Sequence, residues 1–185
     1  MVDKIEIRIS GLGGQGVVLA GQVLGKAAVY SGKNAVQTQS YGAEARGSAA
    51  KSEVIISDSK IGFPIVRKYD ILVAMSQEAV EKNVKDLKEY CVLLVDSSIV
   101  KNVPKIKAKI FRIPATEVAE KTLGEKLYAN MIMLGALNKI VKIVNENSMK
   151  KAIKDTVPKK AITVNIQAYK KGKELIQMKS FYLKL

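Results

Sequence analysis

The chain has 185 residues, of which 31 are Lys or Arg and 17 are Asp or Glu, so its formal net charge is +14. It has no His and one Cys, which excludes a Ser-His-Asp or Cys-His hydrolase and leaves an iron–sulfur cluster short of its roughly four thiolates. The length favours a single domain over residues 1–185, and neither a catalytic residue nor a metal site is expected on this chain alone.

The first half of the chain shows a strand, a glycine cluster and a helix in succession. Ile5, Ile7 and Ile9 alternate with charged residues, which is the period of a strand. Residues 17–30 place small and apolar side chains on one side of a helix, which Gly32 ends. Two further strands are expected, at residues 35–39 and 52–57.

The middle of the chain indicates parallel strands buried on both faces. Residues 70–75 are almost continuously apolar, and Ser76 can cap a helix expected over residues 77–90. A buried strand at residues 92–95 and an alternating strand at the sheet edge, residues 107–113, come next. Helices are then expected at residues 116–123, 127–145, 148–155 and 160–178.

This alternation of strands and helices predicts an α/β class of fold, with a Rossmann-like layered arrangement and a mainly parallel sheet. The last third of the chain is expected to be helical. Residues 1–10 lack the pattern of a signal peptide, and no run approaches the roughly 18 apolar residues of a spanning helix. We therefore expect a cytoplasmic location and no membrane association.

Gly11, Gly13 and Gly16 match the pattern G-x-G-x-x-G between a predicted strand and a predicted helix. The first Gly allows a tight turn, the second lets the backbone approach a phosphate, and the third lets helix and strand pack closely. Residues 35–40 hold no acid for a ribose, which disfavours NAD(P), and Val17 excludes a Walker A loop. Two interpretations stay open: contact with another anionic group, or a turn that only permits tight packing.

A dense polar segment, residues 37–48, follows the second strand at the carboxyl edge where ligands of open α/β sheets gather. Arg46 could bind a carboxylate or phosphate with its two-pronged guanidinium, and Glu44 could orient Arg46 or carry a proton. The alternative is a surface ion pair worth less than about 1 kcal/mol. Weaker candidates are Ser76, more often a helix cap than a ligand contact, and residues 96–98, which suit the same crevice or a simple turn.

Residues 11–21 resemble the start of the gamma subunit of 2-oxoacid:ferredoxin oxidoreductases, and residues 37–47 resemble the second signature of that subunit. The match extends over residues 52–58, 63–64 and 72–79. Within the family, the sequence of these segments is most similar to that of the 2-oxoglutarate enzyme. The family pattern usually has Pro where Ala43 stands and Gly where Ser48 stands. Ala43 makes the loop less rigid, and Ser48 disfavours a positive φ there.

The resemblance implies a multi-subunit enzyme that joins coenzyme A to a 2-oxoacid, releases carbon dioxide and reduces ferredoxin. Thiamine diphosphate, Mg and iron–sulfur clusters are then expected on alpha, beta and delta partner subunits, with coenzyme A as co-substrate and no cofactor held by this chain alone. The gamma domain is expected beside the thiamine site, shaping the cleft that coenzyme A enters. The residues expected to contact coenzyme A are Gly11, Gly13, Gly14, Gln15, Gly16, Tyr41, Glu44, Arg46 and Gly47.

Other functions stay open at this stage. The chain could be the gamma subunit of a pyruvate or a branched-chain or aryl 2-oxoacid enzyme, a purely structural interface subunit, or a free-standing nucleotide-binding enzyme. Residues 1–90 carry 12 basic and 10 acidic groups, whereas residues 91–185 carry 19 basic and 7 acidic groups, which motivates a nucleic-acid-binding module. Few aromatic residues lie among these Lys residues, so we expect no nucleic-acid partner.

Overall fold

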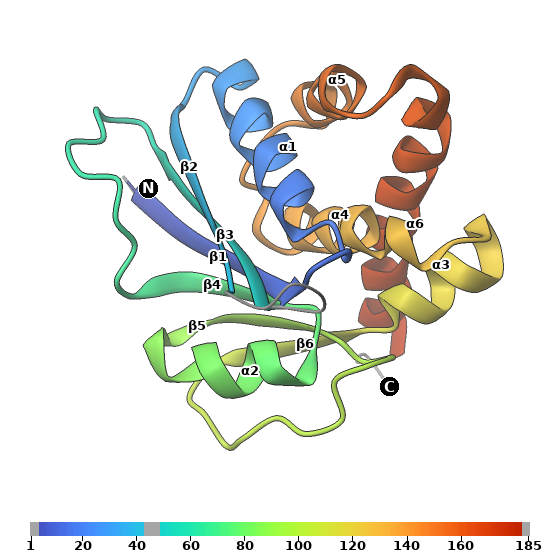
Figure 1. Cartoon of the computed structure of the whole chain (residues 1–185), viewed down its shortest axis with the longest axis horizontal. Coiled ribbons are helices and arrows are strands. Elements are labelled where there is room, and N and C mark those ends of the chain that lie inside the picture. Colours follow the sequence, from blue (N-terminus) through green and yellow to red (C-terminus); the bar gives the residue numbers. More distant parts are fainter. Residues whose placement is uncertain (1–3, 43–48, 183–185) are drawn as a thin grey trace.

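The computed structural model describes residues 4–42 and 49–182 and shows one six-stranded sheet in the order β2-β3-β1-β4-β5-β6 (Figure 1). The ladders β1–β4, β4–β5 and β5–β6 are parallel, whereas β3 runs antiparallel to β1 and to β2. All strands except β3 therefore point the same way, which confirms the predicted mainly parallel sheet. The strands are β1 (Lys4–Leu12), β2 (Asn34–Tyr41), β3 (Ala49–Ser57), β4 (Tyr69–Ala74), β5 (Leu87–Asp96) and β6 (Lys109–Ile113).

The antiparallel strand β3 lies between β1 and β2, the two strands that helix α1 (Val17–Tyr30) connects. In the usual dinucleotide-binding order these two strands are neighbours. Here Ala50 of β3 pairs with Gly11 of β1 on one side and with Tyr41 of β2 on the other. The carboxyl ends of β1 and β2 therefore lie at the same edge, two strand spacings or about 10 Å apart.

The helices divide unequally between the two faces of the sheet (Figure 1). The larger core joins one face, through residues such as Ile9 and Val73, to five helices, whereas the smaller core joins Leu72 and Leu93 on the other face to α2. No helix in the described part of the chain has the length and apolar character needed to cross a membrane. The remaining helices are α2 (Gln77–Asn83), α3 (Ala115–Leu123), α4 (Ala129–Val141), α5 (Glu146–Thr156) and α6 (Ile162–Tyr182).

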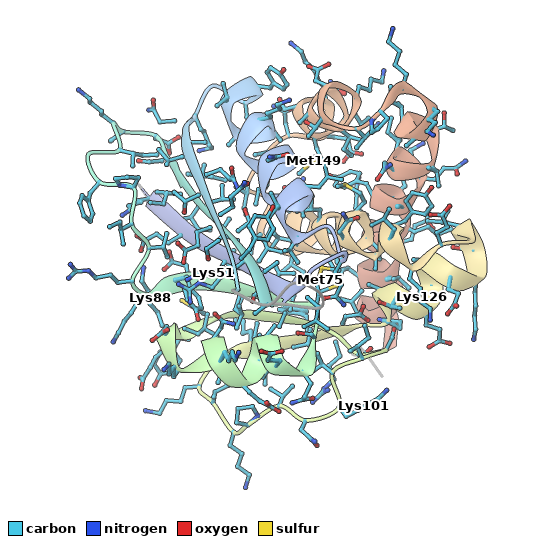
Figure 2. The ribbon with its side chains drawn as sticks, viewed as in Figure 1. Lys51, Met75, Lys88, Lys101, Lys126 and Met149 are labelled. Atoms are coloured by element: carbon cyan, nitrogen blue, oxygen red, sulfur yellow. The ribbon has the colours of Figure 1, made fainter. Side chains whose placement is uncertain are left out.

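The helical C-terminal third is built on α4, which is buried along most of its length. Helix α6 packs against it through two glycines: a β-carbon at Gly135 would collide with the carbonyl oxygen of Tyr169, and one at Gly172 with that of Ile132. Backbone therefore touches backbone at this crossing. Met149 of α5 is buried in the interior, whereas Lys101 and Lys126 lie at the periphery (Figure 2).

The helix predicted over residues 77–90 is too long. Helix α2 ends at Asn83, a 3-10 turn spans Val84–Asp86, and β5 begins at Leu87 because Leu87 pairs with Tyr69 of β4. Pairing to a neighbouring strand has overridden the helical tendency of a mixed-charge segment. The helix predicted over residues 127–145 is also shorter, since Lys142 takes a φ of +50° and ends α4.

Candidate functional site

The glycine loop, residues 13–16, connects β1 to α1 at the carboxyl edge of the parallel strands. Gly14 has a φ of +90° and Gly16 a φ of +70°, both in the region that favours glycine. Gly13 and Gly14 are exposed, and a β-carbon at Gly14 would meet nothing within 4 Å. The loop therefore presents open backbone in front of the first turn of α1, where unpaired N–H groups favour an anion.

The side chain of Gln15 braces this loop from within. Its Oε1 accepts a hydrogen bond from the Leu12 N–H at 2.7 Å, and its Nε2 donates to the Met75 carbonyl at 2.8 Å. A β-carbon at Gly11 would collide with the same Oε1, so Gly11 makes room for the brace. Both polar ends of Gln15 are thus engaged between the ends of β1 and β4, and its part in the site is to hold the loop's shape.

Asn130, at the start of α4, is a residue of this region that the sequence analysis did not identify. It is 1% exposed, its Nδ2 donates to the Gly16 carbonyl at 3.1 Å, and its Oδ1 accepts from the Met131 N–H at 2.7 Å. A polar residue amid the apolar start of α4 was the available signal. The contact fixes the helical third of the chain to the glycine loop.

Tyr41 ends β2 at the same edge as the glycine loop, and its side chain is 60% exposed. The next residue, Gly42, donates its N–H to the Ala49 carbonyl at 2.7 Å, so the two residues that flank positions 43–48 lie side by side. Glu44, Arg46 and Gly47, the remaining candidates, lie outside the described residues. The two predicted motifs therefore converge on one edge through the parts of each that the structure describes.

Two other strand ends at this edge cap helices. Ser76 Oγ accepts the Ala79 N–H at 3.1 Å and so caps α2, as the sequence favoured. The fully buried Asp96 accepts from the Ser98 N–H at 3.1 Å and from the N–H and hydroxyl of Thr116 at 3.0 and 2.5 Å. Its carboxylate therefore fixes a turn and the start of α3, which supports the simpler of the two interpretations.

An open cavity of about 380 Å³ lies beside the same edge, on the face of the sheet that carries α2. Its walls come from the end of the β2–β3 hairpin, including Tyr41 and Gly42, and from the end of α2 with the 3-10 turn after it, including Lys82 and Lys85. This juxtaposition was not predictable from local sequence patterns, because Lys51 and Lys82, the nearest residues of the two walls along the chain, are 31 positions apart.

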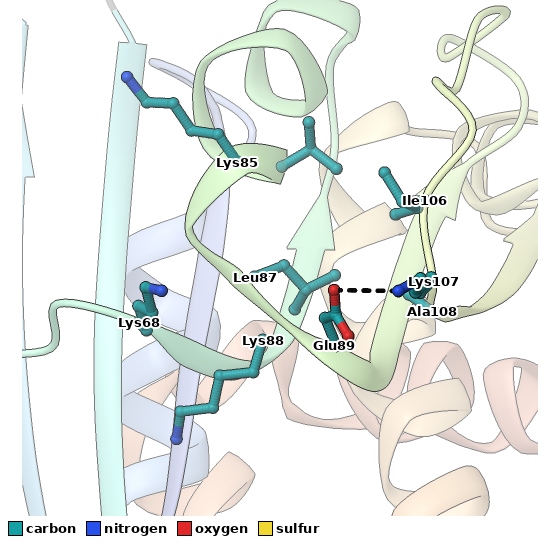
Figure 3. A pocket seen from close by; sticks show the side chains of 9 residues that line it. Lys68, Lys85, Leu87, Lys88, Glu89, Ile106, Lys107 and Ala108 are labelled. Atoms are coloured by element: carbon teal, nitrogen blue, oxygen red, sulfur yellow. Dashed lines mark hydrogen bonds and ion pairs between the residues drawn. The ribbon is translucent and has the colours of Figure 1, made fainter.

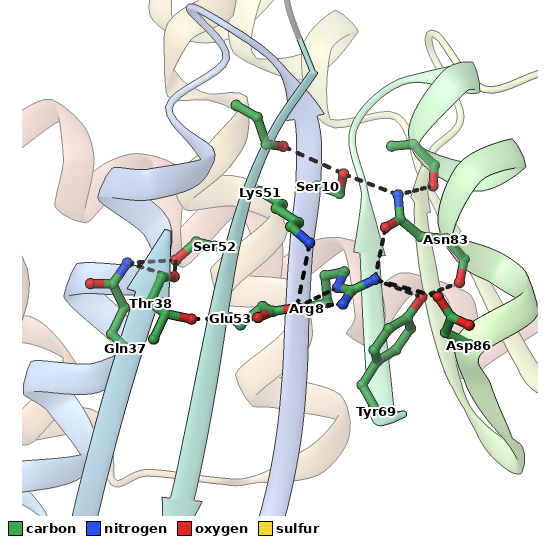
Figure 4. Close-up of polar contacts among 12 residues, drawn as sticks. Arg8, Ser10, Gln37, Thr38, Lys51, Ser52, Glu53, Tyr69, Asn83 and Asp86 are labelled. Atoms are coloured by element: carbon green, nitrogen blue, oxygen red, sulfur yellow. Dashed lines mark hydrogen bonds and ion pairs between the residues drawn. The ribbon is translucent and has the colours of Figure 1, made fainter. Parts of the chain in front are cut away.

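A buried polar network forms the floor of this cavity (Figure 4). Arg8 is 6% exposed, its Nε donates to Glu53 Oε1 at 2.9 Å, and its Nη1 donates to Asn83 Oδ1 at 3.0 Å. The guanidinium also lies 4.4 Å from the centre of the Tyr69 ring. Burial raises the pKa of Tyr69 to about 12 despite the nearby Arg8 charge. The network ties β1 and β3 to the end of α2.

A second cavity, of about 530 Å³, lies at the opposite, amino edge of the parallel strands (Figure 3). Lys68, Leu87 and Lys107 line it, and Lys107 pairs with Glu89 at 3.4 Å. It contains none of the motif residues, so we place the candidate site at the carboxyl edge.

Redox and metal chemistry find little support in the described residues. Cys91 is half-buried, and burial, followed by the Asp70 charge, raises the pKa of its thiol, which disfavours a reactive thiolate. No group of three or more His, Cys, Asp or Glu side chains able to hold a metal ion occurs in the described part of the chain.

Comparison with known proteins gives a consistent result. Residues 6–175 match the family model "Pyruvate ferredoxin/flavodoxin oxidoreductase". The chain is 50% identical to 2-oxoglutarate synthase subunit KorC of Methanocaldococcus jannaschii over 173 residues, 92% of each chain. It is 34% identical to pyruvate synthase subunit PorC of Methanothermobacter marburgensis, and 31% to ketoisovalerate oxidoreductase subunit VorA of Methanothermobacter thermautotrophicus, of whose length it covers 36%.

Solved structures show the same fold. A gamma subunit of a keto/oxoacid ferredoxin oxidoreductase from Geobacter sulfurreducens matches with a TM-score of 0.82 and 42% identity, over 92% of this chain and 96% of that one. A 2-oxoglutarate:ferredoxin oxidoreductase from Magnetococcus marinus, with 2-oxoglutarate, coenzyme A and succinyl-CoA bound, matches with a TM-score of 0.86 and 26% identity. The match covers 96% of this chain and 32% of that one, so there the same fold is part of a longer polypeptide.

Proposed function

Because the chain belongs to the pyruvate ferredoxin/flavodoxin oxidoreductase family, we propose that it is the gamma subunit of a 2-oxoglutarate:ferredoxin oxidoreductase. The complex converts 2-oxoglutarate and coenzyme A to succinyl-CoA and carbon dioxide, and the electrons released by this oxidation reduce ferredoxin. The observation that carries the substrate is the identity of 50% to a 2-oxoglutarate synthase subunit, against 31% and 34% to the ketoisovalerate and pyruvate subunits.

The redox and thiamine chemistry belongs, in this proposal, to alpha, beta and delta partner subunits. A single Cys does not fit an iron–sulfur cluster, and the sequence has no Gly-Asp-Gly motif for thiamine diphosphate and Mg. No step is therefore assigned to such a group on this chain. A cytoplasmic location, where a small redox carrier such as ferredoxin can reach the complex, is part of the proposal.

The proposed contribution of this chain is one wall of the coenzyme A cleft. The open backbone at Gly13 and Gly14 supplies N–H donors, and the positively charged Arg46 guanidinium donates hydrogen bonds to a phosphate. Support comes from the positive φ at Gly14, the open space in front of it, and the pairing of Gly11 and Tyr41 with one residue of β3. The relative from Magnetococcus marinus was solved with coenzyme A bound.

One observation favours the alternative of a purely structural subunit. Gln15, a candidate for ligand contact, has both polar ends engaged within the loop. On this alternative the carboxyl edge binds only a neighbouring subunit, and substitutions there alter assembly without altering the affinity for coenzyme A.

Kinetics of the assembled complex with Arg46→Ala distinguish a chain that forms a wall of the coenzyme A cleft from a purely structural subunit. We expect the KM for coenzyme A to rise about tenfold, because one charge-assisted hydrogen bond is lost, while decarboxylation of 2-oxoglutarate without coenzyme A is nearly unchanged. Arg67→Ala, at an exposed Arg before β4, is the matched control. If both reactions fall together, Arg46 has a structural role.

A further inference from the structure

Strand β2 forms one lateral edge of the sheet. In the order β2-β3-β1-β4-β5-β6 it pairs only with β3, and no other strand in the described part of the chain lies beyond it (Figure 1). It pairs with β3 in continuous register from Asn34 to Tyr41. The outer side of β2 therefore presents a regular row of backbone donors and acceptors to whatever lies beside the sheet.

The pairing with β3 determines which backbone groups of β2 face outwards. Gly42 donates its N–H to the Ala49 carbonyl at 2.7 Å, and the register of the ladder places these two residues opposite each other. Hydrogen-bonded and non-hydrogen-bonded pairs alternate along an antiparallel ladder, so the even-numbered residues of β2 bond to β3. The N–H and C=O groups of Ala35, Gln37 and Gln39 therefore point away from the sheet.

The outer side of β2 lacks the features by which sheets avoid pairing with other chains. Short strands, charged side chains, proline and bulges discourage such pairing. At the opposite lateral edge, β6 has only five residues, and two of them are Lys109 and Arg112. By contrast, β2 has eight residues with neither a charge nor a proline, and its ladder with β3 has no bulge. This difference indicates that another polypeptide segment covers β2 in the native protein.

A cavity of about 310 Å³ lies beside this strand, between α1 and β2. Gly25 and Val29 of α1 and Ala35 and Gln37 of β2 line it, and Val29 is 55% exposed. Side chains alternate between the two faces of a strand, so every second side chain of a strand paired with β2 would lie on the α1 face, next to this cavity. The outer side of β2 thus offers backbone groups for pairing and a cavity for side chains, the two components of recognition by strand addition.

The charge of the chain indicates which kind of strand fits. Lys26 is the only charged residue among the described residues that line this cavity, and Lys151 Nζ lies 4.2 Å from the centre of the Tyr30 ring, which also lines it. A second copy of the chain would bring the same lysines, and a further net charge of +14, against β2. Such repulsion between like charges opposes self-association. A neutral or acidic strand meets no such repulsion.

We propose that β2 pairs with a neutral or acidic extended segment of another subunit, which continues the sheet and places an apolar side chain in the cavity between α1 and β2. The inference rests on the proposed function, since that function makes the chain part of a multi-subunit enzyme. The surface is separate from the glycine loop, because β3 lies between β1 and β2 and the outer side of β2 faces away from both.

Substitution of Gln39 tests the pairing in the reassembled complex. Gln39 is exposed and its N–H points outwards, so Gln39→Pro removes one outward donor without removing a hydrogen bond to β3. We expect the full-length Gln39→Pro chain to fold and to bind the remaining subunits at least about tenfold more weakly than the wild type, because a hydrogen bond is lost and the proline ring obstructs the added strand. The matched control Gln39→Ala removes the same side chain, keeps the N–H and should bind as the wild type does.

Amide hydrogen exchange provides a second measurement, which needs no variant. In the assembled complex the outward amides of Ala35, Gln37 and Gln39 should exchange at least about tenfold more slowly than in the full-length chain purified alone. The amides of Val36 and Thr38, which bond to β3 in both states, should be slowed less. If Gln39→Pro does not fold, this measurement alone decides.

Three results would overturn the inference: equal binding by Gln39→Pro and Gln39→Ala, outward amides that exchange equally fast in the complex and in the chain alone, or protection of these amides by a second copy of the chain. If Arg46→Ala still raises the KM for coenzyme A in that case, the proposed function stands and only the inference about β2 fails.

Discussion

The Asn130 side-chain amide donates a hydrogen bond to the Gly16 carbonyl at 3.1 Å. This bond joins the start of α4, in the helical C-terminal third of the chain, to the last residue of the glycine loop. Gly16 has a φ of +70°, and a β-carbon there would collide with the same amide. Two separate physical reasons therefore require glycine at position 16, whereas Gly14 has only the first, a φ of +90° in open space. This difference yields a stability prediction.

Gly14→Ala should lower the free energy of unfolding by about 1–2 kcal/mol, the cost of a left-handed residue with a side chain. Gly16→Ala should lower it by about 1–3 kcal/mol more, because the new methyl group displaces Asn130. In an Asn130→Ala background this excess should disappear. Urea unfolding of Gly14→Ala and Gly16→Ala, each in the wild-type and in the Asn130→Ala background, checks the prediction. Equal losses of unfolding free energy at the two glycines in the wild-type background would contradict it.

The close packing of α4 against α6 at Gly135 predicts that Gly→Ala substitutions at two helical glycines have opposite effects on the free energy of unfolding. Gly135→Ala should destabilise the chain by about 2–3 kcal/mol, because its β-carbon meets the carbonyl of Tyr169. Gly25→Ala in α1, where the β-carbon would lie 3.7 Å from that of Gln37, should instead stabilise by up to about 1 kcal/mol. Thermal unfolding of both variants measures the contrast, and a stable Gly135→Ala chain would refute the close crossing.

The buried Arg8–Glu53 pair predicts non-additive substitutions. Arg8→Met leaves the Glu53 carboxylate, 13% exposed, without its main cation and should cost about 3–5 kcal/mol. Arg8→Met/Glu53→Leu should be more stable than Arg8→Met alone, because no unpaired charge stays buried. A double-mutant cycle by chemical denaturation gives the coupling energy, and simple additivity would show that the pair is not coupled.

The raised pKa of Tyr69 predicts a loss of stability in alkali. The folded chain keeps the phenol protonated up to about pH 12, whereas an unfolded Tyr ionises near pH 10. The stabilisation is therefore complete below pH 10 and is lost as the pH rises from 10 towards 12. Tyr69→Phe should reduce the slope of the unfolding free energy against pH in that window by about one proton. Tyr41→Phe, at an exposed Tyr, is the control, and equal slopes for Tyr69→Phe and the wild type would contradict the prediction.

Elements with strong local signals were predicted well. Helix α1 spans Val17–Tyr30, as predicted, because a glycine precedes it and the turn at Gly32, with a φ of +79°, follows it. The edge position of β6 also follows from its alternating pattern. By contrast, the sequence could not show that β3 runs antiparallel between β1 and β2, since pairing depends on contacts distant in the chain.

The candidate site was predictable only where one segment carried the chemistry. The glycine pattern and the segment after β2 each follow a predicted strand, and this position in the chain predicts that they lie at the carboxyl edge of the sheet. The basic residues that line the cavity of about 380 Å³ are Arg8, Lys51, Lys82 and Lys85, which come from three separate parts of the chain. None of these residues stands in a motif, and their proximity arises from the sheet order and from the early end of α2. The roles of Glu44, Arg46 and Gly47 stay predictions.

The most direct test of the account is a structure of the native complex, purified through this chain, with coenzyme A bound. The account predicts that the glycine loop and Tyr41 face the cleft of a thiamine-binding partner subunit, with Gly14 in contact with the diphosphate of coenzyme A. A complex in which Gly14 and Tyr41 lie in bulk solvent, remote from coenzyme A and from every other subunit, would contradict it.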